Sequence, residues 1–347
     1  MKTDPTAVHI VQKIQIGRPL LQCAYHPQDP VIFVSGQDSR VWRVTLDRTP
    51  PTELNGHESW VFALAVHPEG HLLYSGGGDG QLLCWLTNGR DSRPRRSVAA
   101  HQGWIRDVAI SADGTLLATC GNDKLVKIWN ADDGKLRFEL RGHASHVDRL
   151  LFHPGGNTLV SGDLHARLVV WDVRTGQKLR EMEAAALYRY DKNSELSVGG
   201  IRGIAFSADG QTLAVSGIRE APNSIGGTVY PGVVLLDFPK GEPLGMWKSR
   251  EELSEVPWEV AFHPTGFFMA ATARHGGGHL LFWRKDNQNE FHSFKLPEGA
   301  RDMSLHPDQI HVATAHGDGH LCVSAMTASS PLKKDAEAKP PDRKESA

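Results

Sequence analysis

The chain has 347 residues, of which 40% are hydrophobic and 22% charged, and its formal net charge is -2. This length allows one large or two ordinary domains, and the composition supplies enough apolar side chains for a sizeable core. The near-zero net charge and the lack of a long basic run argue against sequence-independent nucleic-acid binding as the main role.

The spacing of the cysteines and the length of the apolar stretches indicate neither a secreted protein nor a membrane protein. Cys23, Cys84, Cys120 and Cys322 lie far apart without C-x-x-C spacing, which favours reduced thiols over a zinc site or a disulfide framework. The first 13 residues lack the apolar run of a signal peptide, and no segment reaches the roughly 18 apolar residues of a membrane span. We therefore expect a soluble protein of a reducing compartment, most simply the cytoplasm, with no membrane partner.

In chain order, residues 8–16 form the first predicted strand, and seven related units follow it. Each of the clearest units reads as an apolar-alternating strand, a turn, a second short strand, a polar turn and a third strand. One position opens the first turn of every unit: His26, His67, Ser111, His153, Ser207, His263 and His306. These positions are separated by 41, 44, 42, 54, 56 and 43 residues. The period is that of propeller blades with four strands, which is about 40–45 residues.

Polar residues recur at fixed spacing in the second, third and fourth units. A Gly-His or Ala-His pair precedes each unit, and a Ser or Thr lies ten residues before a Trp. In two units an Asp lies six residues before that Trp. The residues concerned are His57, Ser75, Asp79 and Trp85, then His101, Thr119, Asp123 and Trp129, then His143, Ser161 and Trp171. With these motifs the chain resembles the WD40-repeat β-propellers, over about residues 8 to 326.

The resemblance implies an all-β fold, a seven-bladed propeller closed by an N-terminal strand in the last blade. Residues 1–327 would form a single propeller, with residues 8–16 as the outer strand of blade seven, because the last unit supplies three strands. The recurring His, Ser or Thr, Asp and Trp would form a buried hydrogen-bonded chain that has a structural role. Gly76 to Gly78 are then turn residues and not a phosphate-binding loop, since no helix follows and GK[ST] is absent.

Four units depart from the pattern. His165 stands at the position of the turn aspartate in the fourth unit, and Leu236 and Ser324 replace the tryptophan in the fifth and seventh. The first unit is one residue short in its turn and has Val44 at the tryptophan position. We predict that these blades lack the full hydrogen-bonded chain and are held mostly by apolar packing.

The candidate partner-binding residues lie on one face of the implied propeller, usually called the top. Residues near the start of each innermost strand surround the central channel there, and three long insertions, residues 184–200, 217–232 and 247–257, fall on connections of the same face. Large aromatics and arginines predominate, as in protein-binding surfaces. The channel positions are Leu21, Phe62, Arg106, Asp148, Arg202, Trp258 and Arg301, with Trp60, Trp104 and His146 two residues earlier in their units. In the insertions the candidates are Tyr188, Arg189, Tyr190 and Tyr230.

We therefore predict a non-catalytic scaffold that binds another protein or peptide through its top face, without cofactor or metal. Two alternatives remain open: a propeller enzyme with an axial metal, and an RNA-binding propeller that uses the same arginines and aromatics. The first is disfavoured because the channel positions offer one aspartate among arginines and no G-x-S-x-G or H-E-x-x-H occurs. His275 and His279, across a glycine turn, are the best remaining metal ligands, but a turn role is favoured. Near-zero charge disfavours a nucleic-acid partner. Residues 328–347, with three prolines and no aromatics, are expected to be disordered.

Overall fold

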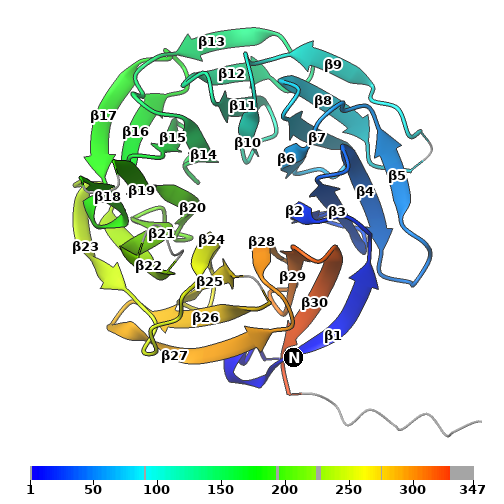
Figure 1. Cartoon of the computed structure of the whole chain (residues 1–347). Helices are drawn as coiled ribbons and strands as arrows, with labels where there is room; N and C mark the ends of the chain where they lie inside the picture. The colour runs from blue at the N-terminus through cyan, green and yellow to red at the C-terminus, as the bar shows by residue number, and fades with distance from the viewer. Residues whose placement is uncertain (1, 90, 193–194, 224–227, 275, 329–347) are drawn as a thin grey trace, which may run out of the picture.

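Seven four-stranded antiparallel sheets stand in a ring around a central axis (Figure 1). They are seen in a computed structural model that describes residues 2–89, 91–192, 195–223, 228–274 and 276–328. The seven-bladed all-β architecture predicted from the repeat is confirmed.

Each of the first four blades is built from four consecutive strands, which follow one another from the axis outward. Blade one contains β2 (Leu20–Tyr25), β3 (Val31–Gly36), β4 (Arg40–Thr45) and β5 (Thr52–Asn55). Blade two contains β6 (Val61–Val66), β7 (Leu72–Gly77), β8 (Gln81–Leu86) and β9 (Arg96–Ala99). Blade three contains β10 (Ile105–Ile110), β11 (Leu116–Gly121), β12 (Val126–Asn130) and β13 (Leu136–Leu140). Blade four contains β14 (Val147–Phe152), β15 (Thr158–Asp163), β16 (Arg167–Asp172) and β17 (Lys178–Glu183).

The last three blades follow the same plan. Blade five contains β20 (Ile201–Phe206), β21 (Thr212–Asn223), β22 (Thr228–Asp237) and β23 (Glu242–Trp247). Blade six contains β24 (Val256–Phe262), β25 (Phe267–Ala273), β26 (Gly278–Arg284) and β27 (Asn287–Leu296). Blade seven contains β28 (Ala300–Leu305), β29 (His311–His316), β30 (His320–Met326) and, outermost, β1 (Val8–Gln15). A short 3-10 helix, η1 (Pro5–Ala7), precedes β1. A second, η2 (Ala185–Leu187), precedes a hairpin of β18 (Tyr188–Asp191) and β19 (Leu196–Gly199).

The ring is closed by the two ends of the propeller. Strand β1 pairs antiparallel with β30, from Val8 opposite Met326 to Gln15 opposite His320. Closure removes the free edge that β30 would otherwise present to solvent. The predicted closure by an N-terminal strand is therefore confirmed. The tail expected from residue 328 lies, from residue 329 on, outside the described residues. Within the described part of the chain, no helix has the length and apolar character needed to cross a membrane.

The hydrophobic core is divided into layers between neighbouring blades. Seven clusters of buried side chains are found, and each joins two consecutive blades, including the last and the first. Strands alternate their side chains between two faces, so both faces of a sheet enclosed by neighbours become apolar. Trp85, Trp171 and Trp283 are among the largest fully buried side chains. Each blade is thus stabilised mainly by its two neighbours.

The landmark histidines connect consecutive blades on the face opposite to the insertions. Nε2 of His26 lies 2.7 Å from the carbonyl oxygen of Gly70, and Nε2 of His263 lies 2.7 Å from that of Gln309. Nδ1 of His26 accepts a hydrogen bond from the backbone N–H of Asp29 at 2.8 Å. Because Nδ1 accepts, Nε2 carries the proton and donates to the next blade. These histidines therefore recur for a structural reason.

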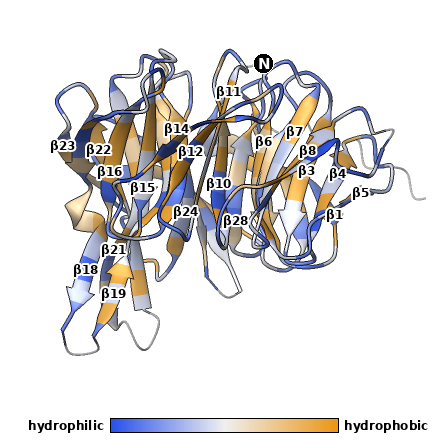
Figure 2. Cartoon of the chain, turned by 90° about the horizontal axis from the view of Figure 1, so that it is seen from above, coloured by the Kyte–Doolittle hydropathy of each residue, from blue (hydrophilic) through white to orange (hydrophobic). Residues whose placement is uncertain are grey.

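Two of the inserted segments project from one face, over blade five (Figure 2). A separate hairpin of β18 (Tyr188–Asp191) and β19 (Leu196–Gly199) precedes β20, and β21 and β22 continue beyond the register of the other blades. The start of β20 pairs with Gly217 of β21, so the far end of β21 lies on the face where the innermost strands begin.

Candidate functional site

A β-bulge near the start of each innermost strand directs one side chain toward the central axis. In all seven blades the pairing between the first and second strand skips one residue. The skipped residue is left out of the ladder, and its side chain is turned away from the regular alternation. The skipped residues are Leu21, Phe62, Arg106, Asp148, Arg202, Trp258 and Arg301. These are the channel positions singled out in the sequence.

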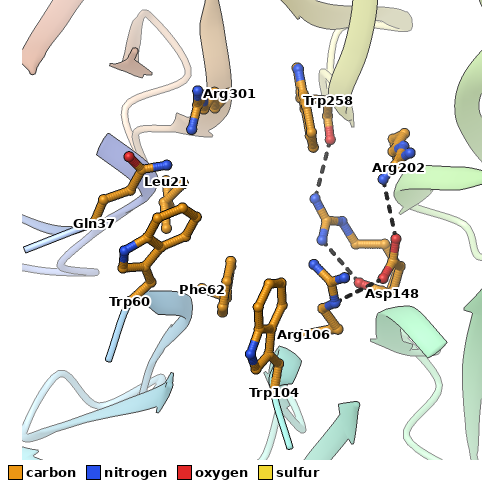
Figure 3. Close-up of a pocket in the computed structure, with 11 residues that line it drawn as sticks. Leu21, Gln37, Trp60, Phe62, Trp104, Arg106, Asp148, Arg202, Trp258 and Arg301 are labelled. Atoms are coloured by element: carbon orange, nitrogen blue, oxygen red, sulfur yellow. Dashed lines mark hydrogen bonds and ion pairs between the residues drawn. The ribbon is translucent and has the colours of Figure 1, made fainter. Parts of the chain in front are cut away.

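The seven bulge residues come together around one pocket, which we call the mouth pocket (Figure 3). Gln37, Trp60, Trp104 and Arg149 complete its lining, and its volume is about 230 Å³. Because all innermost strands begin on the same face, the pocket opens on the side that carries the insertions. A space of this size accommodates one or two side chains of a ligand and not a whole domain.

Aromatic side chains form one wall of the mouth pocket. The rings of Phe62 and Trp104 are stacked with centroids 4.9 Å apart, and Trp60 lies 6.2 Å from Phe62. Trp60 is 43% exposed and Trp104 38%, which is unusual for tryptophan in this chain, where Trp85, Trp171 and Trp283 are buried. Exposed aromatic surface of this kind contributes strongly when it is covered by a partner.

Asp148 connects two of the four arginines of the mouth pocket. Its Oδ1 lies 3.5 Å from Nε of Arg106, and its Oδ2 lies 3.4 Å from Nη1 of Arg202. Arg106 also donates from Nε to Asn122 at 2.8 Å, and its guanidinium lies 4.8 Å from the Trp104 ring centre. The Arg202 guanidinium lies 5.3 Å from the ring centre of Trp258. Both arginines are therefore held in place by groups within the chain.

Arg149 closes the floor of the pocket and was not found by sequence reasoning. Its Nη1 donates to the carbonyl oxygen of Asp148 at 2.9 Å, and its Nη2 donates across the channel to that of Trp258 at 3.4 Å. Burial alone would lower the pKa of Arg149, but the carboxylates of Glu259 and Asp107 raise it. The signal in the sequence is an arginine that follows Asp148 in the strand VDRLLF, whose other residues are apolar. The arginine faces the channel because the bulge shifts the alternation by one residue.

Buried carboxylates below the pocket accept hydrogen bonds from backbone N–H groups at the inner edge of the ring. Oδ2 of Asp107 accepts from the backbone N–H of Leu150 in the next blade, and Oδ2 of Asp302 accepts from that of Cys23, both at 2.8 Å. Innermost strands have unpaired N–H groups that need acceptors when buried. Burial raises the pKa of Asp107 to about 6 and that of Asp302 to about 7. These acids are structural, and the negative charge of Asp302 is reduced near neutral pH.

The polar residues that recur in the repeats form buried hydrogen-bonded chains. In blade two, Nε1 of Trp85 donates to Oγ of Ser75 at 2.8 Å, and Nε2 of His57 lies 2.8 Å from the same oxygen. Nδ1 of His57 lies 3.0 Å from Asp79, whose backbone-bonded carboxylate has a lowered pKa despite burial. The order Ser, His, Asp resembles a hydrolase triad, but Ser75 is fully buried and its oxygen is occupied by the indole.

The same chain is complete in blades three and four. In blade three it joins Trp129, Thr119, His101 and Asp123, with Nδ1 of His101 2.9 Å from the carboxylate. In blade four Trp171 and His143 meet at Ser161, and Nδ1 of His143 lies 2.9 Å from Asp163. In each of the three blades the chain connects the third and second strands to the histidine that precedes the first strand.

The prediction that blade four lacks this chain was wrong. His165 does occupy the aligned turn position, but Asp163 supplies the carboxylate from the end of β15, two residues earlier. Oδ1 of Asp163 also accepts from the backbone N–H of His165 at 2.9 Å and of Arg167 at 3.1 Å. The imidazole needs a carboxylate at one point in space, and two backbone positions can reach that point. His165 is released to pack against Tyr188, 4.9 Å away.

A comparison with protein families matches the same three blades. The model described as WD domain, G-beta repeat matches residues 48–85, 92–130 and 134–172, which contain the tryptophans of the three complete chains. The chain therefore contains three WD40 repeats within its seven-bladed propeller.

Two relatives illustrate how far the similarity of this propeller to other proteins extends. The small ribosomal subunit protein RACK1y of Oryza sativa subsp. japonica is 34% identical over 62 residues, which are 18% of this chain and 18% of that protein. A subunit of chromatin assembly factor 1 from Mus musculus is 23% identical over 181 residues, which are 46% of this chain and 28% of that protein. The aligned regions therefore cover less than a third of either relative.

The other blades of the propeller depart from the repeat in the structure as in the sequence. Among the described residues, the hydroxyls of Ser35 in blade one and Ser324 in blade seven have no hydrogen-bond partner, although both are buried. In blade seven, Oγ1 of Thr314 lies 2.7 Å from Nε2 of His316, and Nδ1 of His316 lies 2.9 Å from the carbonyl oxygen of Glu298.

Blade six has a polar cluster that sequence reasoning missed. Nδ1 of His279 lies 2.9 Å from Glu255, Thr272 contacts the same carboxylate, and the backbone N–H of His279 donates to Thr272 at 2.8 Å. The acid precedes the histidine in the chain, so the order of the motif is reversed and its spacing could not reveal it. His279, the candidate metal ligand of a disfavoured alternative, is thus engaged with Glu255, and His275 lies outside the described residues.

Five candidate residues do not line the mouth pocket. His146 lies before β14, while Tyr188, Arg189 and Tyr190 lie on the projecting hairpin and Tyr230 on the extension of β22. Tyr190 is 51% exposed, whereas Tyr188 is half-buried with its hydroxyl 3.1 Å from Ser197. The ring centre of Tyr230 lies 5.1 Å from the guanidinium of Arg219. They form a second group, beside the pocket on the same face.

Among the described residues, two groups of side chains at the opposite face could offer metal ligands: His67, Glu69 and His71, and His306, Asp308 and His311. In each group one histidine already accepts through Nδ1 from a backbone N–H, His67 from Glu69 at 3.2 Å and His306 from Asp308 at 3.0 Å. They belong to the turns between the first and second strands of blades two and seven.

Proposed function

We propose that this WD40 propeller is a non-catalytic scaffold that binds another protein through the face carrying the mouth pocket. The observation that carries the proposal is the concentration of exposed tryptophan and arginine at and beside the seven bulge positions. Tryptophan and arginine are the residues that most often contribute binding energy in protein interfaces. Elsewhere in the ring the recurring tryptophans are buried and the recurring polar residues are used internally.

The insertions support the same face. Tyr190 and Leu196 of the projecting hairpin are 51% and 45% exposed, which extends the apolar surface beyond the pocket. A rigid ring that carries loops on one face separates the requirements of stability from those of recognition. The names of both relatives, a ribosomal subunit protein and a subunit of an assembly factor, describe parts of larger assemblies.

We further propose that the protein works in a reducing compartment such as the cytoplasm. The four cysteines are all buried and unpaired. Burial raises the pKa of Cys23 and Cys120 well above the usual value, so these thiols stay protonated and unreactive.

An axial metal enzyme is less well supported by the geometry. A hard cation needs several oxygen ligands that converge on one point. The lining of the mouth pocket contains one carboxylate, Asp148, which already lies between Arg106 and Arg202.

The proposal is tested by replacing the exposed tryptophans and measuring capture of cellular proteins. We expect the double variant Trp60→Ser, Trp104→Ser to lose most co-purifying proteins, as quantified by mass spectrometry against the unchanged chain, with Tm lowered by a few degrees at most. The matched control is Leu136→Ser, Leu179→Ser, which removes equally exposed apolar side chains from outer strands (47% and 53%) and should keep the captured proteins. Equal capture by the tryptophan variant and the unchanged chain would contradict the proposal.

A further inference from the structure

The lining of the mouth pocket carries more positive than negative charge, and the excess lies on one side. Arg106 and Arg202 share Asp148, and Nε of Arg149 lies 3.8 Å from Glu259. The lining contains four guanidiniums and one carboxylate, while Glu259, Asp107 and Asp302 lie below it and act on Arg149. Figure 3 shows Arg301 across the mouth from Asp148, beside Leu21 and Gln37.

Arg301 makes no hydrogen bond or ion pair with any of the residues that the structure describes, unlike Arg106, Arg149 and Arg202. Its side chain is half-buried, and burial lowers its pKa. A guanidinium taken partly out of water without a counter-charge is unfavourable, and an anion placed beside it recovers that cost.

The two carboxylates that line a second depression beside Arg301 are engaged elsewhere. Arg301 also borders a depression lined by Glu298 and Asp318. Oε1 of Glu298 accepts from the backbone N–H of Gly276 at 3.1 Å and of Gly299 at 3.0 Å. Asp318 accepts from the backbone N–H of His320 at 3.1 Å, and its Oδ2 contacts His320 and Lys13. The chain itself thus leaves Arg301 available to an external anion.

We propose that the mouth pocket receives an acidic or phosphorylated side chain from an extended segment of the partner protein, and that Arg301 binds its anionic group. This inference rests on the proposed function. Arg301 supplies a planar fork of donors suited to a carboxylate or phosphate, and the amide of Gln37 lies beside it. Trp60, Phe62 and Trp104 cover the apolar residues next to the anion.

The dimensions of the pocket favour a peptide over a nucleic acid. Arg149 closes the floor and the volume is about 230 Å³, so one side chain can enter but a strand cannot pass along the channel. Single-stranded nucleic acids are bound by long grooves in which basic residues follow many phosphates. A chain with a net charge of -2 and basic groups gathered at one point does not provide such a groove.

The test uses immobilised full-length chain and libraries of octapeptides with one fixed central residue and random flanking positions. The fixed residues are aspartate, glutamate, phosphothreonine, asparagine and alanine, and a uridine decanucleotide is included as a probe. We expect the acidic or the phosphorylated library to be retained about tenfold better than the asparagine library. The phosphothreonine and carboxylate arms then show which of the two sources of the anion the pocket takes.

Variants assign the effect to Arg301. Arg301→Gln should abolish the preference for anions, Arg301→Lys should retain part of it, and Asp148→Asn should increase it by removing a competing carboxylate. Arg137→Gln, on an exposed outer strand, is the matched control and should change nothing. Thermal melting confirms that each variant is folded.

Three results would overturn the inference: equal retention of anionic and asparagine libraries, an anion preference that survives in Arg301→Gln, or preferential retention of the oligonucleotide. These three results differ from the result that would contradict the scaffold proposal. If the tryptophan variant still loses its cellular partners while no anion preference exists, the scaffold proposal stands and the role of Arg301 falls.

Discussion

At the scale of single residues, the blades differ in whether their buried hydroxyl groups have hydrogen-bond partners. Ser75, Thr119 and Ser161 each connect a tryptophan N–H to a histidine, whereas Ser35 is equally buried without a partner among the described residues. A buried polar group that loses its partner carries the full cost of its desolvation. The contribution of the same residue type should therefore differ strongly between blades two and one.

Replacing Ser75 by alanine should destabilise the chain by about 1–3 kcal/mol, because the indole N–H of Trp85 and Nε2 of His57 both lose their partner. Ser35→Ala is the matched control and should change the free energy of unfolding by less than about 0.5 kcal/mol. Urea denaturation followed by circular dichroism measures both. Equal effects of the two substitutions would show that the hydrogen-bonded chain does not stabilise blade two.

In blade four, Asp163 and not His165 should matter for stability. Asp163→Ala leaves the buried Nδ1 of His143 without its acceptor and should cost about 1–3 kcal/mol. His165→Ala removes only a contact with Tyr188 and should cost less than about 1 kcal/mol. Thermal melts of the two single variants compare them, and a larger effect at His165 would contradict the assignment of Asp163.

Asp302 should give the stability of the chain a component that falls as pH rises. Burial raises its pKa from 3.8 to about 7, so between these values the folded chain holds a proton that the unfolded chain has released. The stabilising contribution is complete below about pH 4 and is lost toward pH 7. Asp302→Asn should lose this component. The Tm of the variant, measured relative to that of the unchanged chain, should therefore rise between pH 5 and pH 7.5. A constant difference in Tm over this range would contradict the shift.

At the scale of elements, β1 links the two ends of the propeller. Val8 and Ile14 of this strand belong to the layers on either side of blade seven, and the strand covers the edge of β30. Because each layer is shared by two blades, loss of β1 weakens both neighbours of blade seven as well as the sheet itself.

Removal of residues 1–16 should lower the free energy of unfolding by about 3 kcal/mol or more, from lost apolar burial and lost strand pairing. The exposed edge of β30 should also promote self-association. Adding a synthetic peptide of residues 2–17 should restore Tm, whereas a scrambled peptide should not. Unchanged Tm after truncation would show that the pairing of β1 does not stabilise the ring.

The elements differ in how far the sequence could reveal them. The alternation of apolar residues and the period of the units specify the strands and the ring, because every blade repeats the same burial. The bulge positions were found by alignment of the units alone, and their unpaired geometry explains why they surround the pocket. Asp163, Glu255 and Arg149 were missed, since a carboxylate or guanidinium can reach one point in space from several backbone positions. The pairing of β18 with β19 was also not predicted, because insertions lack the repeat.

At the scale of the whole molecule, stability and recognition are assigned to different residues. The buried layers and hydrogen-bonded chains keep the ring closed, and the landmark histidines join the blades at one face. The opposite face gathers seven bulge residues, two exposed tryptophans and the projecting hairpin (Figures 2 and 3). Under the proposed function, a partner binds this face without any change in the ring.

Site-specific photo-cross-linking tests this division most directly. A photoreactive amino acid is placed at Trp60 in the mouth, at Leu179 on an outer strand, or at Glu69 on the opposite face, and each chain is illuminated with extract of its native host. The account predicts that the variant at Trp60 forms cross-links to a small set of proteins that are absent with the other two. Cross-links to the same proteins from Leu179 or Glu69, with none from Trp60, would contradict it.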